Sequence, residues 1–539
     1  MRAASAGWWL LLGVLWLANL PLRPLFDPDE GRYAEIPREM VASGDWVTPT
    51  LNDLKYFEKP PLQYWATAAL YRVFGVHEWT ARLYATALGF LCIPLVFAFC
   101  RRIGYGTDTA VIAATLLAIN PYFAITGQLN LLDQGFTFFL SAALFSFVVA
   151  QREHGAAQRS RNWMLLTWAA LGLAVLSKGV VTLVLAGATL AAYLAVTRDL
   201  ALLRRLHLRA GLALFALVTV PWFWLVQSRN PEFFQFFFVR EHVERFLTTI
   251  HDRIEPFWYF LPIMLVALLP VVGNWRRWRL AKIEGERTPG EFRAELFLIL
   301  WCAIVFVLFS CSQSKLASYV LPVMPPLAVV LARVTQAQPS AFGRAKWITV
   351  GFLLLIAAAL AFFGWRRMGS VPASSTGWAL LAGLTCIGYV IVERLRSRRT
   401  VPHRWRGLAA VSIAGYQILA LCYAATYPAR SGEEIVAEVA GSIRPDTKLY
   451  SVGQYRHSLS FYLQRPLEVY DYRGELDFGM HQAGRTDDGQ NRDNFLDCWQ
   501  GEANAIAFID PRVYELLTAA GMPGRVVARD AHSIVVARS

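Results

Sequence analysis

The 539-residue chain has few charged residues for its length. Asp, Glu, Lys and Arg make up 17% of the residues, whereas about 25% is usual in soluble domains. Hydrophobic residues account for 55% of the chain, which is more than a water-exposed surface can accommodate. The composition therefore predicts a membrane protein with many spans.

The sequence also lacks the patterns of a disulfide framework or a zinc site. Six of its seven cysteines lie in or at the ends of apolar segments, where cysteine behaves as a small hydrophobic residue. Cys498 is the only cysteine in the polar C-terminal region, so that region cannot close an internal disulfide. There is no CxxC pair, no Cys/His zinc spacing, no repeat and no low-complexity tract.

The positive charge has a topological explanation. The formal net charge is +13, but Lys and Arg lie mostly in short loops between apolar segments, as topology determinants do. Nucleic acid is therefore not an expected partner. The segment Gly7–Leu22 follows Arg2, and no small-x-small cleavage site comes after it. We interpret it as a retained first span rather than a signal peptide.

Roughly 13 apolar runs are candidates to cross a bilayer as helices. They fall near 7–22, 79–100, 108–126, 130–150, 163–176, 179–197, 209–227, 257–273, 294–311, 316–335, 345–364, 377–394 and 405–426. The stretch from 163 to 197 is interrupted at Ser177-Lys178-Gly179, which predicts two short helices there.

Alternate loops differ strongly in charge. Loops on one side carry most of the Lys and Arg, and this bias does not change sign along the chain. It places the N-terminus in the cytoplasm and, with an odd number of spans, the C-terminus outside. Three outside segments are long: 23–78, 228–256 and everything after Tyr427. We expect residues 1–427 to form a membrane domain and residues 428–539 a small periplasmic α/β domain.

Local patterns in that C-terminal domain alternate between the two kinds of secondary structure. Helical patterns lie near 432–441 and 511–520. Strand-like runs are Lys448–Val452, Leu459–Leu463, Leu467–Tyr472, Ala505–Asp510, Val526–Ala528 and Ser533–Ala537.

The first long loop opens with an acidic motif, DPDEGRYAE, at Asp27 to Glu35. Pro28 suits the first helical position, and Asp27 with Glu30 fits a capping box. Capping leaves Asp29 unexplained. Asp29 lies one helical turn from Arg32 and Tyr33 and can share a face with them. Asp29 is therefore a candidate catalytic carboxylate.

A second motif, YFEKPPLQYW, ends the same loop. Its two prolines stop one element and start another, so Glu58 and Lys59 are expected at a fixed turn. The alternative is an ordinary surface ion pair, which contributes little.

Further charged residues lie at the outer ends of spans. Asp133 starts the fourth span, where a charge needs a partner or water. Lys178 and Lys315 follow tight outer turns, where a lysine can bind a lipid phosphate or simply anchor the span by snorkelling. In the second outside loop, Arg240 and Arg245 can bind an anionic headgroup.

Together these motifs resemble the lipid A aminoarabinose transferases, in the protein O-mannosyltransferase-like branch of the GT-C glycosyltransferases. The resemblance covers the whole chain and implies a mainly α, polytopic GT-C fold. It rests on DPDEGRYAE, YFEKPPLQYW, the span-start Asp133, REHVERF and SKLASYVLP.

The resemblance implies an inverting transfer of a sugar from undecaprenyl phosphate to an acceptor at the periplasmic face of the bacterial inner membrane. The expected sugar is 4-amino-4-deoxy-L-arabinose, the expected acceptor is lipid A, and the protein is expected to be a monomer. Protein or another envelope glycan stays open as the acceptor. A polyprenyl-lipid transporter is less favoured, because its charges should lie at mid-span.

By the same resemblance Asp29 is the central acidic residue of the site. Glu58 and Asp133 are further catalytic candidates. Arg32, Tyr56 and Lys59 are expected around them, and Lys178, Lys315 and Tyr319 near the donor phosphate.

A divalent metal, expected to be zinc, is implied near Glu58 and His242. Two protein ligands are fewer than the three that catalytic zinc normally has. The alternative is therefore that Glu58 pairs with Lys59 while His242 hydrogen-bonds a backbone carbonyl. An amino-sugar donor also predicts a carboxylate for its ammonium group, and Glu58, Glu35 and Asp133 all qualify.

The charge bias leads to a prediction about topology. In a variant without native cysteines, a cysteine introduced near Asp53 should react with an impermeant thiol reagent in intact cells, because loop 23–78 lies outside. A cysteine in the Arg-rich loop 394–407 is the control and should react only after permeabilisation. The opposite pattern would overturn the proposed location of the site.

Overall fold

The computed structural model describes two compact units. One is a helical bundle (Met1–Leu20, Glu58–Gln63 and Leu83–Thr426), and the other, here called the second unit, joins most of the first loop to the C-terminal segment (Pro21–Phe57, Tyr64–Arg82 and Tyr427–Ser539). The described residues are 2–244, 255–269, 271, 292–338, 340–368, 373–395, 400–485 and 490–538.

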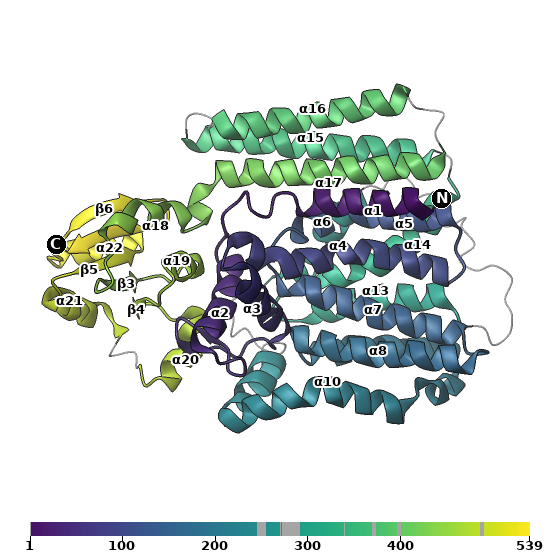
Figure 1. Cartoon of the computed structure of the whole chain (residues 1–539), viewed down its shortest axis with the longest axis horizontal. Coiled ribbons are helices and arrows are strands. Elements are labelled where there is room, and N and C mark those ends of the chain that lie inside the picture. The colour runs from purple at the N-terminus through teal and green to yellow at the C-terminus, as the bar shows by residue number, and fades with distance from the viewer. Residues whose placement is uncertain are drawn as a thin grey trace. The chain divides into compact units, whose positions relative to one another are not determined.

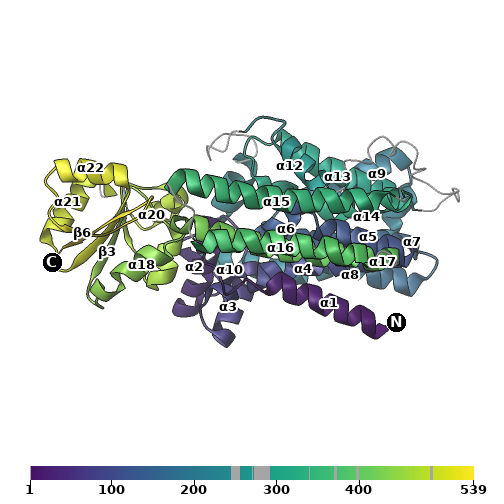
Figure 2. The same ribbon diagram turned by 90° about the horizontal axis from the view of Figure 1, so that it is seen from above.

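Long apolar helices lie side by side in the bundle (Figures 1 and 2). Among the described residues, eight segments are long and apolar enough to cross a membrane. They are α4 (Glu78–Arg102), α7 (Leu132–Arg152), α10 (Leu208–Arg229), α13 (Ala294–Cys311), η4 with α14 (Ala317–Val323, Met324–Gln336), α15 (Ala341–Met368), α16 (Ala373–Leu395) and α17 (Val401–Thr426).

The other predicted runs overlap helices that are shorter or more polar. These are α1 (Arg2–Leu17), α5 (Thr107–Ala118) with α6 (Pro121–Thr126), α8 (Ala157–Lys178), α9 (Val181–Thr197) and α12 (Phe260–Leu268). The predicted break between α8 and α9 is confirmed, because Gly179 adopts a positive φ of 89° there. The count of 13 spans stays a prediction.

The bundle has an apolar outside as well as an apolar inside. Trp16 and Trp301 are fully buried in its core, whereas Leu217 on α10 and Leu384 on α16 are 71% and 65% exposed. A soluble protein rarely exposes apolar surface on this scale. The inner face is buried by helix packing, and lipid is the solvent that suits the apolar outer face. Two short elements, η1 (Leu200–Leu206) and η2 (Gln235–Glu244), flank α10.

A five-stranded sheet forms the centre of the C-terminal segment, in the order β4-β3-β5-β7-β6. Strand β3 pairs parallel to β4 and β5, and β7 pairs antiparallel to β5 and β6. Phe495, Trp499 and Leu517 pack on one face of the sheet. The strands are β3 (Lys448–Val452), β4 (Glu468–Tyr470), β5 (Ala505–Ile509), β6 (Arg525–Arg529) and β7 (Ile534–Arg538).

The helices of the second unit come from both parts of the chain. From the loop come α2 (Asp29–Ser43) and most of α3 (Leu62–Phe74), with a hairpin of β1 (Thr50–Leu51) and β2 (Leu54–Lys55) between them. From the C-terminal segment come η5 (Pro428–Arg430), α18 (Glu433–Val439), η6 (Ala440–Ser442), α19 (His457–Leu463), η7 (Gly474–Leu476), α20 (Asp477–Gln482), α21 (Arg492–Gly501) and α22 (Pro511–Ala519).

One predicted strand is wrong. The run Leu459–Leu463 lies in α19, which packs against α2. A short apolar run does not by itself distinguish a buried strand from a buried helix. The other five strand-like runs each contain or overlap an observed strand.

A pair of buried carboxyl groups lies on α2. Glu35 accepts two short hydrogen bonds from Arg38, at 2.6 and 2.7 Å. Glu39 accepts the N–H of Asn52 at 2.6 Å, and both its oxygens lie within 3.3 Å of the N–H of Asp53. Burial, and secondly the charge of Glu35, raise the pKa of Glu39 to about 8. Glu39 is therefore protonated at neutral pH.

This proton makes stability depend on pH. Glu39 is protonated up to about pH 8 in the folded state but only to about pH 4.3 when unfolded. Stability therefore falls as pH rises through that window, since the folded state binds the extra proton. Glu39→Gln should flatten the fall in apparent melting temperature between pH 5 and 8. The control Glu434→Gln, on an exposed residue, should keep the wild-type slope. An unchanged slope in Glu39→Gln would contradict the assignment.

Candidate active site

The predicted capping box at the start of α2 is wrong. Helix α2 begins at Asp29, and its N-cap residue Pro28 makes no side-chain cap. The carboxylate of Asp27 instead accepts the N–H of Ser458 at 2.8 Å and its hydroxyl at 2.6 Å, and lies 3.3 Å from Nε of Arg456. Asp27 therefore binds the loop to the C-terminal segment, over a sequence separation that no local pattern reveals.

Glu30 also has another role than capping. Its carboxylate pairs with Arg23 at 3.2 Å and with Arg82 at 2.7 Å, and it accepts the N–H of Phe26 at 3.1 Å. Burial alone would raise the pKa of Glu30, but the two guanidinium groups outweigh it and lower the pKa to about 2. The ionised Glu30 holds the first turn of α2 in place.

The structure brings Asp29, Arg32, Tyr33 and Tyr56 together at that turn. The side chain of Asp29 is 47% exposed and that of Arg32 only 3%. Nη2 of Arg32 lies 3.7 Å from Asp29 and donates to Glu475 at 2.6 Å, while Nη1 lies 3.5 Å from the Tyr56 hydroxyl. The guanidinium also stacks over the Tyr33 ring at 5.7 Å. The site therefore presents an accessible carboxylate backed by a buried cation.

In the bundle, Lys59 lies between two carboxylates. Its ammonium is 3.9 Å from Glu58 and 3.6 Å from Glu241, and it donates to the Glu58 carbonyl at 2.8 Å. The side chain of Lys59 is 16% exposed, and Pro60-Pro61 precede α3 as predicted. This is a partly buried cluster rather than an exposed surface pair.

A second cluster in the bundle joins α7 to α8. Lys178, the last residue of α8, donates to the carboxylate of Asp133 in the first turn of α7. The ammonium lies 4.7 Å from the Tyr319 ring and 5.4 Å from the Phe136 ring. Asp133 thus has the partner that a charge at a span end requires.

The remaining predicted cations are Lys315, Arg240 and Arg245. Lys315 donates to the carbonyls of Glu255 and Ser312, at 3.0 and 2.6 Å, which leaves the third of its N–H donors for another acceptor. Arg240 lies over the Phe236 ring at 5.6 Å. Arg245 lies outside the described residues, as does the side chain of His242.

Of the two residues predicted to hold a metal, Glu58 has a described side chain and His242 does not. Lys59 next to Glu58 offers a competing partner for its carboxylate. Within the part of the chain that the structure describes, no group of three or more His, Cys, Asp or Glu residues is placed to hold a metal ion.

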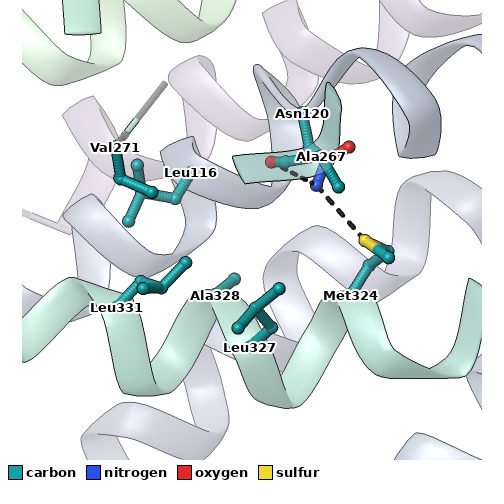
Figure 3. Close-up of a pocket in the computed structure, with 8 residues that line it drawn as sticks. All are labelled: Leu116, Asn120, Ala267, Val271, Met324, Leu327, Ala328 and Leu331. Carbon is teal, nitrogen blue, oxygen red and sulfur yellow. Dashed lines mark hydrogen bonds between the residues drawn. The ribbon is translucent and has the colours of Figure 1, made fainter. Parts of the chain in front are cut away.

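A further feature of the bundle is a pocket whose described lining residues include none of these charged groups (Figure 3). Among the described residues that line it, Asn120 is the one polar side chain, and its amide nitrogen donates to the Ala267 carbonyl at 3.2 Å and to Sδ of Met324 at 3.3 Å. None of these described lining residues is titratable.

Local sequence reasoning missed three important residues. Glu475 and His457 lie in the C-terminal segment, and Glu241 is buried beside Lys59. Glu241 belongs to the REHVERF motif, from which only Arg240, His242 and Arg245 were selected as candidates. Nothing in the immediate sequence of Glu475 and His457 distinguishes them, because their partners are distant in the chain. The structure also removes Glu35 as a ligand for an amino sugar, since Glu35 is fully buried and bound to Arg38.

Comparisons with known proteins agree with both parts of the chain. A family described as dolichyl-phosphate-mannose-protein mannosyltransferase matches residues 11–237. A family described as the aminoarabinose transferase C-terminal domain matches residues 435–538.

Similar curated proteins bear one name, undecaprenyl phosphate-alpha-4-amino-4-deoxy-L-arabinose arabinosyl transferase. The protein from Sodalis glossinidius is 30% identical over 91% of this chain and 90% of its own. The one from Aeromonas hydrophila is 29% identical over 88% and 87%. The one from Edwardsiella ictaluri is 32% identical, over 65% of this chain and 63% of its own length.

A solved structure matches the full length. The crystal structure of ArnT from Cupriavidus metallidurans bound to undecaprenyl phosphate is 33% identical, covers 100% of this chain and 98% of its own, and gives a TM-score of 0.87. Identity and coverage at this level show common ancestry over the whole chain. The chain belongs to the aminoarabinose transferase family and is a membrane glycosyltransferase with the GT-C fold.

Proposed function

We propose that this protein transfers 4-amino-4-deoxy-L-arabinose from undecaprenyl phosphate to lipid A, with inversion at the anomeric carbon. The observation that carries the proposal is full-length similarity to a protein solved with undecaprenyl phosphate, together with relatives named for this sugar and this carrier. The match of residues 435–538 to an aminoarabinose transferase C-terminal domain supports this sugar, and the resemblance of the motifs to the lipid A aminoarabinose transferases supports lipid A as the acceptor.

We propose that the reaction takes place at the periplasmic face of the bacterial inner membrane. We also propose that the protein is a monomer. The support for orientation is the charge bias of the loops. Loop 23–78, which carries Asp29, and the C-terminal segment are then both outside. Lipid A and a polyprenyl-linked sugar would approach this face from the same bilayer.

The chemistry needs cations for the leaving group. The bond between the anomeric carbon and the donor phosphate oxygen breaks, and undecaprenyl phosphate leaves with the electron pair. Lysines in a low-dielectric cleft stabilise that developing charge. We assign this role to Lys59, Lys178 and Lys315, with Tyr319 close to Lys178.

The acceptor decides what Asp29 does. If a hydroxyl oxygen forms the new bond to the anomeric carbon, Asp29 takes its proton as the general base. If a lipid A phosphate oxygen attacks, the acceptor is already anionic, and Asp29 stabilises the positive charge that develops on the sugar. An exposed carboxylate beside a buried arginine suits both roles. Tyr33, Arg240 and Arg245 are proposed to contact the lipid substrates.

A divalent metal held by Glu58 and His242 remains a proposal for this chain. Bound there, it would offset negative charge on the donor phosphate, and phosphate or water oxygens would have to complete its coordination. Metal analysis of the purified protein, with and without undecaprenyl phosphate, measures it directly. A stoichiometric metal lost in both Glu58→Gln and His242→Ala would support the site, and full activity after exhaustive chelation would exclude an essential metal.

Expression in a host that makes the undecaprenyl-linked sugar but lacks its own transferase tests the function. Mass spectrometry of lipid A should show the added mass of an aminopentose, because no other step needs to be supplied. The empty vector is the control. The proposal would be contradicted if lipid A stayed unmodified and the added sugar were found on protein or another envelope glycan. That result would indicate a related GT-C activity instead.

A further inference from the structure

The region around the start of α17 is rich in arginine and poor in acidic residues. Residues 394–406 include six arginines and no Asp or Glu. Glu393, which precedes them, accepts hydrogen bonds from Arg404 at 2.7 Å and from Lys346 at 2.8 Å. Helix α1, which packs against α17, contains no acidic residue. The acidic residue nearest to Arg406 in the sequence is therefore already bound to two cations.

Arg406 on α17 and Trp8 on α1 are hydrogen-bond donors without an acceptor. The guanidinium of Arg406 lies over the indole of Trp8, 5.2 Å from the ring centroid, where the two helices run side by side (Figures 1 and 2). Nε of Arg406 and Nε1 of Trp8 are both covered and have no hydrogen-bond partner among the described residues. Covered donors that stay unpaired are costly, so the pair calls for an acceptor from outside the protein.

We propose that Arg406 and Trp8 bind the phosphate of an anionic phospholipid headgroup. A phosphodiester supplies the oxygen acceptors that both groups lack, and a guanidinium binds such a group through two parallel hydrogen bonds. Arg406 is only partly buried, and its Nη1 and Nη2 are not covered, so a headgroup can reach it from the surface. This lipid is neither donor nor acceptor of the proposed reaction, and the inference does not depend on the transferred sugar.

The site lies at the level along the bundle where a headgroup is expected. Tryptophan is enriched where a membrane meets water, and two further tryptophans of the bundle lie beside cations. Arg102 lies 5.4 Å from the Trp163 ring, and Lys346 lies 4.8 Å from the Trp347 ring. All of these residues belong to the ends of spans next to the loops rich in Lys and Arg. With the orientation proposed above, the lipid comes from the cytoplasmic leaflet.

The surface of α1 beyond Trp8 suits the acyl chains of the same lipid. Leu10 and Val14 are 70% and 59% exposed, and Leu11 is exposed as well. Because a helix rises about 1.5 Å per residue, Val14 lies about 9 Å further along the axis than Trp8. A lipid with its phosphate at Trp8 can therefore lay its chains along these apolar side chains. Free phosphate has no such contacts, which favours a lipid as the source of the phosphate group.

The charges at the site select a headgroup with net negative charge. An ethanolamine headgroup carries an ammonium group near its phosphate, and the guanidinium of Arg406 would repel it. Glu393 cannot receive that ammonium, since it already accepts from Arg404 and Lys346. A glycerol headgroup brings only hydroxyl groups. Phosphatidylglycerol should therefore bind more tightly than phosphatidylethanolamine.

Titration of the purified full-length protein in detergent, followed by native mass spectrometry, tests the site. The wild type should bind phosphatidylglycerol several-fold more tightly than phosphatidylethanolamine. In Arg406→Gln the Kd for phosphatidylglycerol should rise about tenfold or more, because the charge-assisted hydrogen bonds are lost. The matched control is Arg394→Gln, on an exposed residue of the same loop, which should keep the wild-type Kd. An unchanged Kd in Arg406→Gln would overturn the proposal.

Trp8→Phe separates the site from a general attraction of lipid to positive charge. Phenylalanine keeps an aromatic ring under the guanidinium and removes only the indole N–H. Binding of phosphatidylglycerol should weaken several-fold, because one of the two proposed donors to the phosphate is lost. If Arg406→Gln does not fold, this variant still tests the inference. Wild-type affinity in Trp8→Phe would contradict it.

Inorganic phosphate and glycerol phosphate distinguish a lipid site from a plain anion site. Neither should displace bound phosphatidylglycerol when added at the same concentration, since neither has acyl chains to lie along α1. Displacement by either one would overturn the assignment to a lipid. Equal affinity for phosphatidylglycerol and phosphatidylethanolamine would indicate an unselective lipid shell and would also overturn the proposal.

Discussion

The ion pairs of Glu30 with Arg23 and Arg82 determine where the candidate catalytic acid lies. All three side chains are at most 3% exposed, and Arg82 also donates to the Arg23 carbonyl at 2.8 Å. Removing one partner of such a buried pair typically costs about 3–5 kcal/mol, because it leaves an uncompensated charge. Since Asp29 precedes Glu30 on the same helical turn, anchoring Glu30 also sets the direction of Asp29. The two arginines therefore compensate the buried negative charge of Glu30 in the first turn of α2.

The charged residues of the second unit and those of the bundle are neutralised in different ways. In the second unit a buried arginine accompanies an exposed carboxylate, which suits a group that meets substrate in water. In the bundle Lys59, Lys178 and Lys315 lie beside carboxylates or carbonyls, which lowers the cost of holding a charge near lipid.

Features set by composition or local pattern could be predicted from the sequence, and features set by distant contacts could not. The apolar runs, the break at Gly179 and five of six strand-like runs follow from local periodicity. The capping box failed because Asp27 binds Ser458, 431 residues away. The same limit hid Glu475, whose partner Arg32 is 443 residues away. Asp29 was singled out as a candidate because capping left it unexplained, but its exposure and its buried neighbours required the structure.

The turnover of the purified Asp29→Asn variant with donor and lipid A tests the account most directly. Asparagine keeps the shape of the side chain and removes the charge on which both proposed roles of Asp29 depend. Loss of a positioned acid or base typically lowers kcat by about a hundredfold or more, and we expect such a fall with unchanged melting temperature and undecaprenyl phosphate affinity. Wild-type turnover in this variant would contradict Asp29 as the catalytic carboxylate.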